Sequence, residues 1–293
     1  MSDLQIYLDG DIVPAGEATV SVFDHSFLYG DGCFEGIRVY DNRIFALDAH
    51  LDRLYDSATM LDIDIPLTSD EFAEAHAEVL RANPDDVTYL RPVVSRGEGP
   101  VGIGYSRDLD GPRIVIIPQI RPAKYRDEQY EAGLSLETLS IRRTPFEHLE
   151  SRIKSNNYLN NILAKLEVFD GDADDGVLLD ADGYVAEACA GNLFCVNDGV
   201  LQTPTRQNVL NGITRQTVLD LAAEASIETS EERLTPYDFI TADEAFLTST
   251  MSEIAPVTAV DGRTVDDGSP GPITRELTSR YREYAASHGY EWR

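Results

Sequence analysis

The chain has 293 residues, of which 42% are hydrophobic, and it carries 24 basic against 52 acidic residues for a net charge of −28. This length favours two domains over one, and so negative a field disfavours nucleic-acid binding because it repels phosphates. No apolar run approaches the roughly 20 residues that a membrane helix requires, so no membrane span is expected. The acidic excess is spread along the chain, which favours adaptation to a high-salt cytosol over a mildly acidic ordinary protein.

Two further features indicate the compartment. The N-terminal stretch Met1–Gln5 lacks the basic start of a signal peptide. Cys33, Cys189 and Cys195 form neither a CxxC pair nor an even framework, which predicts buried free thiols in a reducing environment. We therefore expect a cytoplasmic protein.

The first 122 residues alternate short strands with two helices. Leu4 to Val13 predicts a hairpin around an Asp-Gly turn. Hydrophobic periodicity predicts a helix over Leu47–Leu61 and a second over Thr68–Ala82, capped by Thr68 or Ser69 with Glu71 in its first turn. Further strands are expected at Val20–Phe23, in the run that ends at Tyr40, at Val87–Val94 and at Ile114–Ile120. The glycine-rich segment between the last two predicts a flexible loop, not a phosphate loop.

Polar residues from Arg121 to Gln129 follow the strongly apolar strand, and we place the domain boundary there. The expected fold is α/β (α+β) with two domains: a small N-terminal α+β domain (1–122), a linker (123–131) and a larger C-terminal α/β domain (132–293). The second domain is expected to contain strands at Leu134–Leu139 and Gly176–Leu179, a hairpin turn at Asp182-Gly183, and helices over Thr214–Ala225 and Ile273–Ser287.

Lys154 stands out because lysine is scarce in this chain. Ser155, Asn156 and Asn157 follow it, and an apolar rhythm from Tyr158 to Phe169 predicts an amphipathic helix that starts near Asn156. The partial positive charge of a helix start disfavours an ammonium, which would make Lys154 a nucleophilic amine suited to a Schiff base. The alternative is an ordinary surface lysine.

Three more motifs carry polar groups that a phosphorylated ring requires. Glu187 lies among small residues with few obvious charge partners, which suggests a carboxylate facing a flat ligand such as a pyridinium ring. Gly212 opens a helix whose first amides, of Ile213 and Thr214, would point at an anion. A strand then ends in the hydroxyls around Thr250. Each motif alone is more often a turn or cap, but with Lys154 they describe a pocket for pyridoxal 5′-phosphate.

A fourth motif suits a carboxylate. Tyr89 and Arg91 are two positions apart on a predicted strand, so both point to one face. A hydroxyl beside a guanidinium can bind a carboxylate, and the alternative is a solvent-facing pair.

The run from Glu187 through Asn192-Leu193-Phe194 to Leu210-Asn211-Gly212-Ile213-Thr214-Arg215 resembles the signature of class IV aminotransferases, the fold-type IV pyridoxal-phosphate enzymes with the D-amino acid aminotransferase-like fold. Lys154–Leu159, Cys33–Arg38 and Ala49–Leu54 resemble other motifs of this class, so the resemblance covers essentially the whole chain.

The resemblance implies the cofactor site. Lys154 would form the Schiff base and move the substrate proton, Glu187 would pair with the pyridine nitrogen, and Tyr158 would hydrogen-bond the ring hydroxyl. The other contacts, to the phosphate or the ring, would come from Arg53, Leu210, Gly212, Ile213, Thr214 and Thr250. No metal is expected.

Within the class, the chain most resembles branched-chain amino acid aminotransferases, whose Phe-Glu-Gly-Ile-Arg and Tyr-x-Arg patterns stand here at Phe34–Arg38 and Tyr89–Arg91. This implies transfer of the amino group of Leu, Ile or Val to 2-oxoglutarate by a ping-pong mechanism. Small-molecule amino acids and 2-oxo acids would contact Tyr29, Phe34, Gly36, Arg38, Tyr89, Arg91, Tyr125, Met251 and Ser252.

The resemblance also implies a homodimer, with a hexamer as the larger alternative, because the Tyr29 segment and the Val101–Ile103 loop cross to the partner's site in this family. Cys33, Gly191, Met251 and Ser252 depart from the usual pattern and leave the side-chain preference open.

Three other functions fit the sequence less well. A D-amino acid transaminase typically needs an Arg-x-His clamp, and Pro92 and Val93 follow Arg91 here. An aminodeoxychorismate lyase fits poorly with the intact Phe34–Arg38 motif. A cofactor-binding protein without turnover would need neither Lys154 nor Glu187.

Overall fold

The chain passes between two compact units more often than a single linker would require. The computed structural model describes residues 4–107 and 109–293. The first unit runs to Pro122 and also includes Ile153–Asn157 and Ala285–Arg293, and the second comprises Ala123–Arg152 and Tyr158–Tyr284. No helix in the described ranges is long and apolar enough to cross a membrane.

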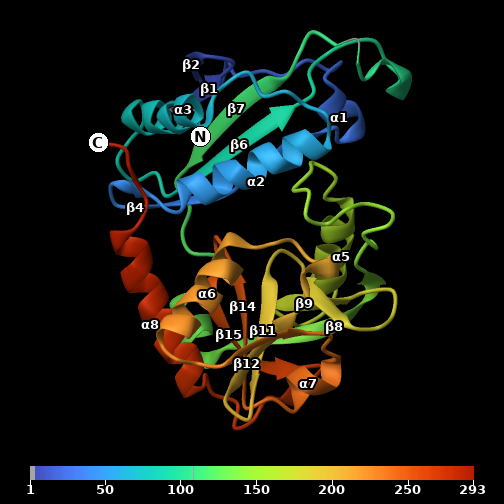
Figure 1. Ribbon diagram of the computed structural model, residues 1–293, viewed down its shortest axis with the longest axis vertical. Coiled ribbons are helices and arrows are strands. Elements are labelled where there is room, and N and C mark those ends of the chain that lie inside the picture. The colour runs from blue at the N-terminus through green and yellow to red at the C-terminus, as the bar shows by residue number, and fades with distance from the viewer. Residues whose placement is uncertain (1–3, 108) are drawn as a thin grey trace. The chain divides into compact units, whose positions relative to one another are not determined.

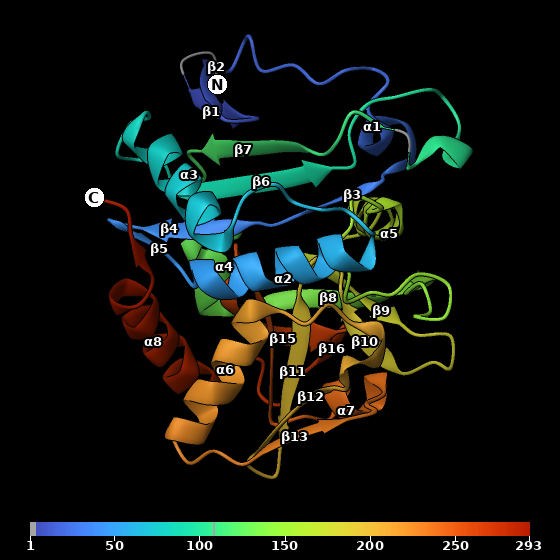
Figure 2. The same cartoon turned by 45° about the horizontal axis from the view of Figure 1, so that its top comes forward.

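The first unit is built on one sheet, whose strand order among the described residues is β17-β5-β4-β6-β7-β1-β2, with β3 paired to β6. Helices α2 and α3 pack against each other, α3 also contacts β1 and β7, and α2 contacts β3 (Figures 1 and 2). The elements are β1 (Gln5–Leu8), β2 (Asp11–Pro14), α1 (His25–Tyr29), β3 (Gly32–Phe34), β4 (Ile37–Tyr40), β5 (Arg43–Ile44), α2 (Leu47–Met60), α3 (Ser69–Arg81), β6 (Tyr89–Ser95), a 3-10 turn (Ile103–Tyr105), β7 (Arg113–Gln119) and β17 (Tyr290–Glu291).

Local chemistry explains the elements that the sequence predicted in this unit. Asp9 and Gly10 both have positive φ, as a two-residue hairpin turn requires. Thr68 and Glu71 form the predicted reciprocal cap of α3. The strand predicted at Val20–Phe23 was wrong: this stretch is irregular, and Val20, Val22 and Phe23 are exposed. β-branched residues favour strands only where a neighbouring strand and a core are available.

The second unit is built on a mixed sheet with the order β10-β9-β8-β15-β14-β11-β12-β13 among the described residues, and β16 pairs with β15. β8 runs parallel to β9 and to β15, and β12 parallel to β13. The elements are α4 (Asp127–Ala132), β8 (Leu134–Arg142), α5 (Leu159–Phe169), β9 (Asp175–Leu179), β10 (Val185–Ala188), β11 (Asn192–Asn197), β12 (Val200–Pro204), a 3-10 turn (Arg206–Asn208), α6 (Ile213–Glu224), β13 (Thr229–Glu232), α7 (Pro236–Ile240), β14 (Glu244–Ser249), β15 (Glu253–Val260), β16 (Arg263–Thr264) and α8 (Pro272–Ser287).

Helix α5 confirms the predicted helix but presents its apolar side to the outside. It begins at Leu159, later than expected, and its buried residues are Asn161, Ala164 and Val168. The residues that carried the apolar rhythm are exposed in the single chain, with Phe169 at 71% and the others being Leu159, Ile162, Leu163 and Leu166. The helix is amphipathic as predicted, but its apolar side does not pack against the core of this unit.

Candidate active site

Lys154 lies in a non-helical segment before α5, next to Ser155, which forms a β-bridge with Cys33. The Lys154 carbonyl accepts from the Phe34 amide at 3.0 Å, and its amide donates to Ser57 Oγ at 3.1 Å. Ser57 Oγ in turn donates to the Arg53 carbonyl of α2 at 2.8 Å. Because a helix dipole acts only within the first turn and α5 begins at Leu159, the predicted influence of a helix start on Lys154 is not supported. β3 and α2 fix this residue instead.

Two cations share one aromatic ring in the first unit. Lys154 Nζ lies 4.8 Å from the centroid of the Phe34 ring, and the Arg91 guanidinium carbon lies 4.5 Å from the same centroid. Cations over an aromatic face are attracted by its quadrupole. The buried ring of Phe34 therefore contacts both the predicted reactive amine of Lys154 and the Arg91 guanidinium of the predicted carboxylate site.

Arg53 is directed at a buried carboxylate. Its Nε and Nη2 donate to the two oxygens of Glu35 at 2.7 and 2.8 Å, and His50 Nδ1 lies 2.8 Å from Glu35 Oε2. Burial raises the pKa of Glu35, but Arg53 and His50 together hold it well below its usual range. This bidentate pair with a buried carboxylate fixes the guanidinium of Arg53.

The predicted carboxylate site is preformed. Arg91 Nε donates to Tyr89 Oη at 2.9 Å, so the two side chains meet on one face of β6. A Cβ on Gly36 would lie 2.4 Å from Tyr89 Oη, which explains why glycine occupies that position. Arg121 also stacks on the Tyr89 ring at 5.4 Å, and sequence reasoning missed it. The pairing of β6 with β7 could have indicated this contact, because Arg121 lies just after the end of β7. Arg38 lies 5.6 Å from the ring of Tyr40 on β4.

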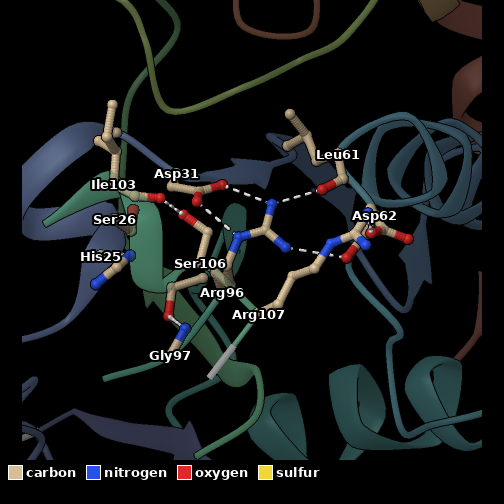
Figure 3. Close-up of polar contacts among 12 residues, drawn as sticks. His25, Ser26, Asp31, Leu61, Asp62, Arg96, Gly97, Ile103, Ser106 and Arg107 are labelled. Carbon is tan, nitrogen blue, oxygen red and sulfur yellow. Dashed lines mark hydrogen bonds and ion pairs between the residues drawn. The ribbon is translucent and has the colours of Figure 1, made fainter. Parts of the chain in front are cut away.

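The loop after β6 is anchored through Arg96, as Figure 3 shows. Arg96 Nε donates to Asp31 Oδ2 at 2.6 Å, and its Nη1 donates to the Asp62 carbonyl at 2.9 Å. It also bonds the Leu61 carbonyl, and Arg107 pairs with the Asp62 carboxylate at 3.2 Å. The loop is thus tied to the end of α2 and to the segment after α1.

His25 makes a second link between α1 and this loop. Its amide donates to the Gly97 carbonyl at 2.9 Å, and its buried ring Nε2 lies 3.1 Å from the Pro100 carbonyl. The same ring meets Tyr29 edge-on at 5.1 Å between centroids. Tyr29 and the exposed Val101–Ile103 loop therefore belong to one connected structure.

In the second unit, Glu187 on β10 is buried and has two partners. Its Oε2 accepts from the Leu210 amide at 3.0 Å, and its Oε1 lies 2.7 Å from Arg143 Nε. The Nε–H is not directed along that line, so this contact is an ion pair and not a hydrogen bond. The sequence offered few obvious charge partners for Glu187, and the structure supplies one, Arg143. Arg143 follows β8, and only the pairing of β8, β9 and β10 brings it near.

The turn before α6 has the features of an anion site. The helix begins at Ile213 with Gly212 as its N-cap, and in the described chain no side chain caps it. Asn192 Nδ2 donates to the Leu210 carbonyl at 2.9 Å, and a Cβ on Gly212 would lie 2.1 Å from Asn192 Oδ1. Within the described residues no side chain caps the first amides of α6, those of Ile213 and Thr214, and uncapped amides at a helix N-terminus can bind an anion.

The remaining predicted residues of this unit lie in the β14–β15 turn, near the start of the predicted linker and at the start of α5. Thr250, Met251 and Ser252 form that turn, and Ser252 Oγ bonds Ser249 Oγ at 2.8 Å. Tyr125 is buried, and its hydroxyl donates to Asp175 Oδ2 at 2.8 Å. Tyr158 occupies the N-cap position of α5.

Each unit thus gathers its own share of the predicted residues. The first holds Tyr29, Phe34, Gly36, Arg38, Arg53, Tyr89, Arg91 and Lys154, and the second holds Tyr125, Tyr158, Glu187, Leu210, Gly212, Ile213, Thr214, Thr250, Met251 and Ser252.

Comparison with known proteins gives a consistent result. The family model described as amino-transferase class IV matches residues 32–260. A protein of Methanocaldococcus jannaschii, provisionally assigned as a branched-chain-amino-acid aminotransferase, is 44% identical over 287 residues that cover 98% of each chain. A D-alanine aminotransferase of Bacillus licheniformis is 32% identical over 281 residues, covering 94% of each chain.

A solved structure agrees in fold. The branched-chain amino acid aminotransferase of Thermobaculum terrenum in its pyridoxal-phosphate form superimposes with a TM-score of 0.87 at 32% identity, covering 100% of this chain and 97% of that one. The expected two-domain fold is confirmed. Since the matched model spans most of the sequence and these similarities run nearly end to end, the chain belongs to the class IV aminotransferases.

Proposed function

We propose that the protein is a branched-chain L-amino acid aminotransferase, which moves the amino group of leucine, isoleucine or valine to 2-oxoglutarate in two alternating half-reactions. The observation that carries this proposal is the near end-to-end similarity to proteins named for that activity. The preformed Tyr89–Arg91 pair supports it, because both substrates carry carboxylates.

Enzymes of this class use pyridoxal 5′-phosphate, and the second unit fits that group. The uncapped start of α6 offers amides to a phosphate, and the buried Glu187 carboxylate offers an acceptor to a ring N–H. When bound, the cofactor supplies an aldehyde that condenses with amines and a ring that withdraws electrons from the substrate's α-carbon.

Lys154 is the proposed catalytic residue. Its Nζ is the amine that holds the cofactor and then carries the proton from and back to the substrate. Glu187 keeps a proton on the ring nitrogen, and Tyr158 donates to the ring hydroxyl. Leu210 and Gly212 form the surface next to the ring.

The phosphate is proposed to bind Arg53, the amides of Ile213 and Thr214, and the Thr250 hydroxyl. Glu35 occupies two nitrogens of Arg53, which fixes the guanidinium plane before any ligand arrives. An anion site arranged in advance loses little conformational entropy on binding.

Substrate recognition is proposed to divide between charged and apolar groups. Tyr89 and the amides after Thr250 hold the α-carboxylate, and Arg91 and Arg38 serve the second carboxylate of glutamate. The apolar side chain contacts Tyr29, Phe34, Gly36, Tyr125 and Tyr158. Met251 and Ser252 narrow the pocket relative to the small residues usual there.

A visible absorbance scan and a donor panel test the proposal. The purified protein with added cofactor should absorb in the visible range, and L-leucine or L-glutamate should shift that band to shorter wavelength. Lys154→Ala should lose the band, whereas Lys165→Ala, at a lysine placed outside the site, should keep it. L-leucine, L-isoleucine, L-valine and L-glutamate should all donate to suitable 2-oxo acids at high salt.

The D-alanine aminotransferase relative favours a second candidate, a D-amino acid transaminase. Transfer from D-alanine alone would overturn the branched-chain assignment. Formation of an aromatic product from aminodeoxychorismate would point to the lyase of the same fold.

We also propose that the chain works as a homodimer, with a hexamer as the larger assembly. Support comes from the exposed apolar side of α5 and from the exposed apolar residues Val22, Phe23, Phe27 and Ile103 of the first unit. Contiguous apolar patches on a single chain mark interfaces.

A reducing, salt-rich cytoplasm is the proposed setting. The three cysteines are free and buried. The net charge of −28 is tolerable where salt screens self-repulsion.

A further inference from the structure

Asp175, at the start of β9, is a buried carboxylate that gathers cations and a hydroxyl. Lys124 Nζ lies 2.7 Å from its Oδ2, and Tyr125 Oη donates to the same oxygen at 2.8 Å. Lys165 Nζ of α5 lies 3.7 Å from Oδ1. The chain has three lysines, so both lysines other than Lys154 converge on this one carboxylate.

The predicted linker (residues 123–131), which belongs to the second unit, is also attached to the β14–β15 turn. The Lys124 amide donates to the Met251 carbonyl at 3.2 Å, and Tyr130 Oη donates to the Ser252 carbonyl at 2.9 Å. The linker thus joins Asp175 on one side and the turn on the other. Three proposed substrate residues, Tyr125, Met251 and Ser252, belong to this single hydrogen-bonded structure.

We propose that Asp175 is a positioning residue that, through Lys124 and Tyr125, fixes the linker against the Met251–Ser252 turn and so sets the range of amino donors. This inference rests on the proposed function, because it assumes that Tyr125 and the turn contact the substrate side chain. Asp175 is not among the residues proposed to contact the substrate.

The physical basis is the cost of a buried charge. The Asp175 side chain is 1% exposed, so salt screens its pairing with Lys124 much less than it screens surface pairs. Burial raises the pKa of Asp175, but Lys124 and Lys165 hold it down at about 2, so the carboxylate is charged at any working pH. Releasing the linker would leave that charge underpaired, which is strongly unfavourable.

Lys165 provides a matched control. It faces the same carboxylate and also donates to the Asp174 carbonyl at 2.9 Å, but it lies on α5 and not on the linker. Replacing either lysine removes one cation from Asp175, and only the replacement of Lys124 also removes a contact between residues 123–131 and Asp175.

The experiment compares Lys124→Met, Tyr125→Phe and Lys165→Met in the holoenzyme. Two quantities are measured: the ratio of kcat/KM for L-leucine to that for L-glutamate, and hydrogen exchange of the peptide covering residues 123–131. We expect Lys124→Met and Tyr125→Phe to change the ratio at least threefold and to speed exchange in that peptide. Lys165→Met should lower the melting temperature and leave both quantities at their parental values.

Two results would overturn the inference. One is an unchanged ratio and exchange rate in Lys124→Met. The other is an equal change in Lys165→Met, which would reduce the cluster to general stability. A parent enzyme that transfers no amino group from branched-chain donors would instead contradict the proposed function, and the exchange comparison would still show whether Asp175 anchors the linker. Asp175→Asn extends the series if it folds.

Discussion

Several single residues in this protein are held by buried polar contacts that cannot be predicted from the sequence. Glu35, Glu187 and Asp175 are each nearly inaccessible, and each is compensated by an arginine or lysine from a distant part of the chain. His76 is a different case. It is fully buried on α3, its Nδ1 bonds the Phe72 carbonyl at 2.7 Å, and burial lowers its pKa to about 4.

His76 should make the protein sensitive to mild acid. The unfolded state takes up a proton near pH 6.5 and the folded state only near pH 4, so stability is lost as pH falls between these values. The loss from this group reaches about 3 kcal/mol. The free energy of unfolding of His76→Gln should therefore vary less over that range, as measured by urea unfolding at a series of pH values. His148→Gln, at an exposed site, should leave the slope unchanged. Parallel slopes for parent and His76→Gln would contradict this account.

Gly36→Ala should weaken substrate binding without unfolding the protein. The added Cβ would displace Tyr89 Oη, which lies 2.4 Å from its position, and break the bond from Arg91. The displaced Tyr89 could then no longer donate to the substrate carboxylate, and a hydrogen bond to a charged group contributes about 2 kcal/mol, or roughly 30-fold in binding. We expect KM for L-leucine and for 2-oxoglutarate to rise by about that factor. Gly16→Ala, where a Cβ meets nothing within 4 Å, should behave like the parent. A parental KM in Gly36→Ala would show that Tyr89 does not hold the carboxylate.

At the scale of elements, residues 153–157 and helix α5 show how context overrides local pattern. The segment that carries Lys154 pairs with β3 of the first unit, although the elements before and after it in the sequence belong to the second. The expectation that residues 123–131 form a single linker between two domains stays a prediction. Helix α5 has the periodicity of a core helix, yet its apolar side is exposed.

Charges on the apolar side of α5 should dissociate the proposed dimer. Leu166 and Phe169 are exposed, and burying a glutamate in their place would cost several kcal/mol. The double variant Leu166→Glu/Phe169→Glu should sediment as a single chain of 32.4 kDa, whereas the parent sediments at twice that mass or more. Met60→Glu, at an exposed apolar residue of α2 in the first unit, serves as the control and should not dissociate. A parent that is already a single chain would refute the proposed interface.

At the scale of the whole molecule, charge is the dominant property. The chain carries 52 acidic residues and a net charge of −28, and the acidic residues are distributed over both units. Self-repulsion on this scale opposes compactness at low ionic strength, where the Debye length exceeds the spacing of surface charges.

The melting temperature should therefore rise with potassium chloride between about 0.1 and 1 M, over which the Debye length falls from roughly 10 to 3 Å. Differential scanning fluorimetry across this series is the measurement. Sucrose at matched osmolality is the control, because it stabilises folded proteins without screening charge. A melting temperature that responds to sucrose and salt equally would mean that the acidity carries no electrostatic requirement for salt.

The sequence by itself determined the local elements, because hydrophobic period, turn residues and caps act within a few positions: the Asp9-Gly10 hairpin, α2, α3, α6 and α8 all formed as predicted. It also determined the family, since the model of the class IV aminotransferases matches residues 32–260. Only the tertiary structure decided which residues support Lys154, Glu187 and the other predicted site residues. Arg143 and Glu187, Glu35 and Arg53, and Asp175 and Tyr125 are each separated along the chain, and strand pairing and helix packing bring them within reach. Periodicity likewise reports that α5 has an apolar side, but not whether that side meets a core or another chain.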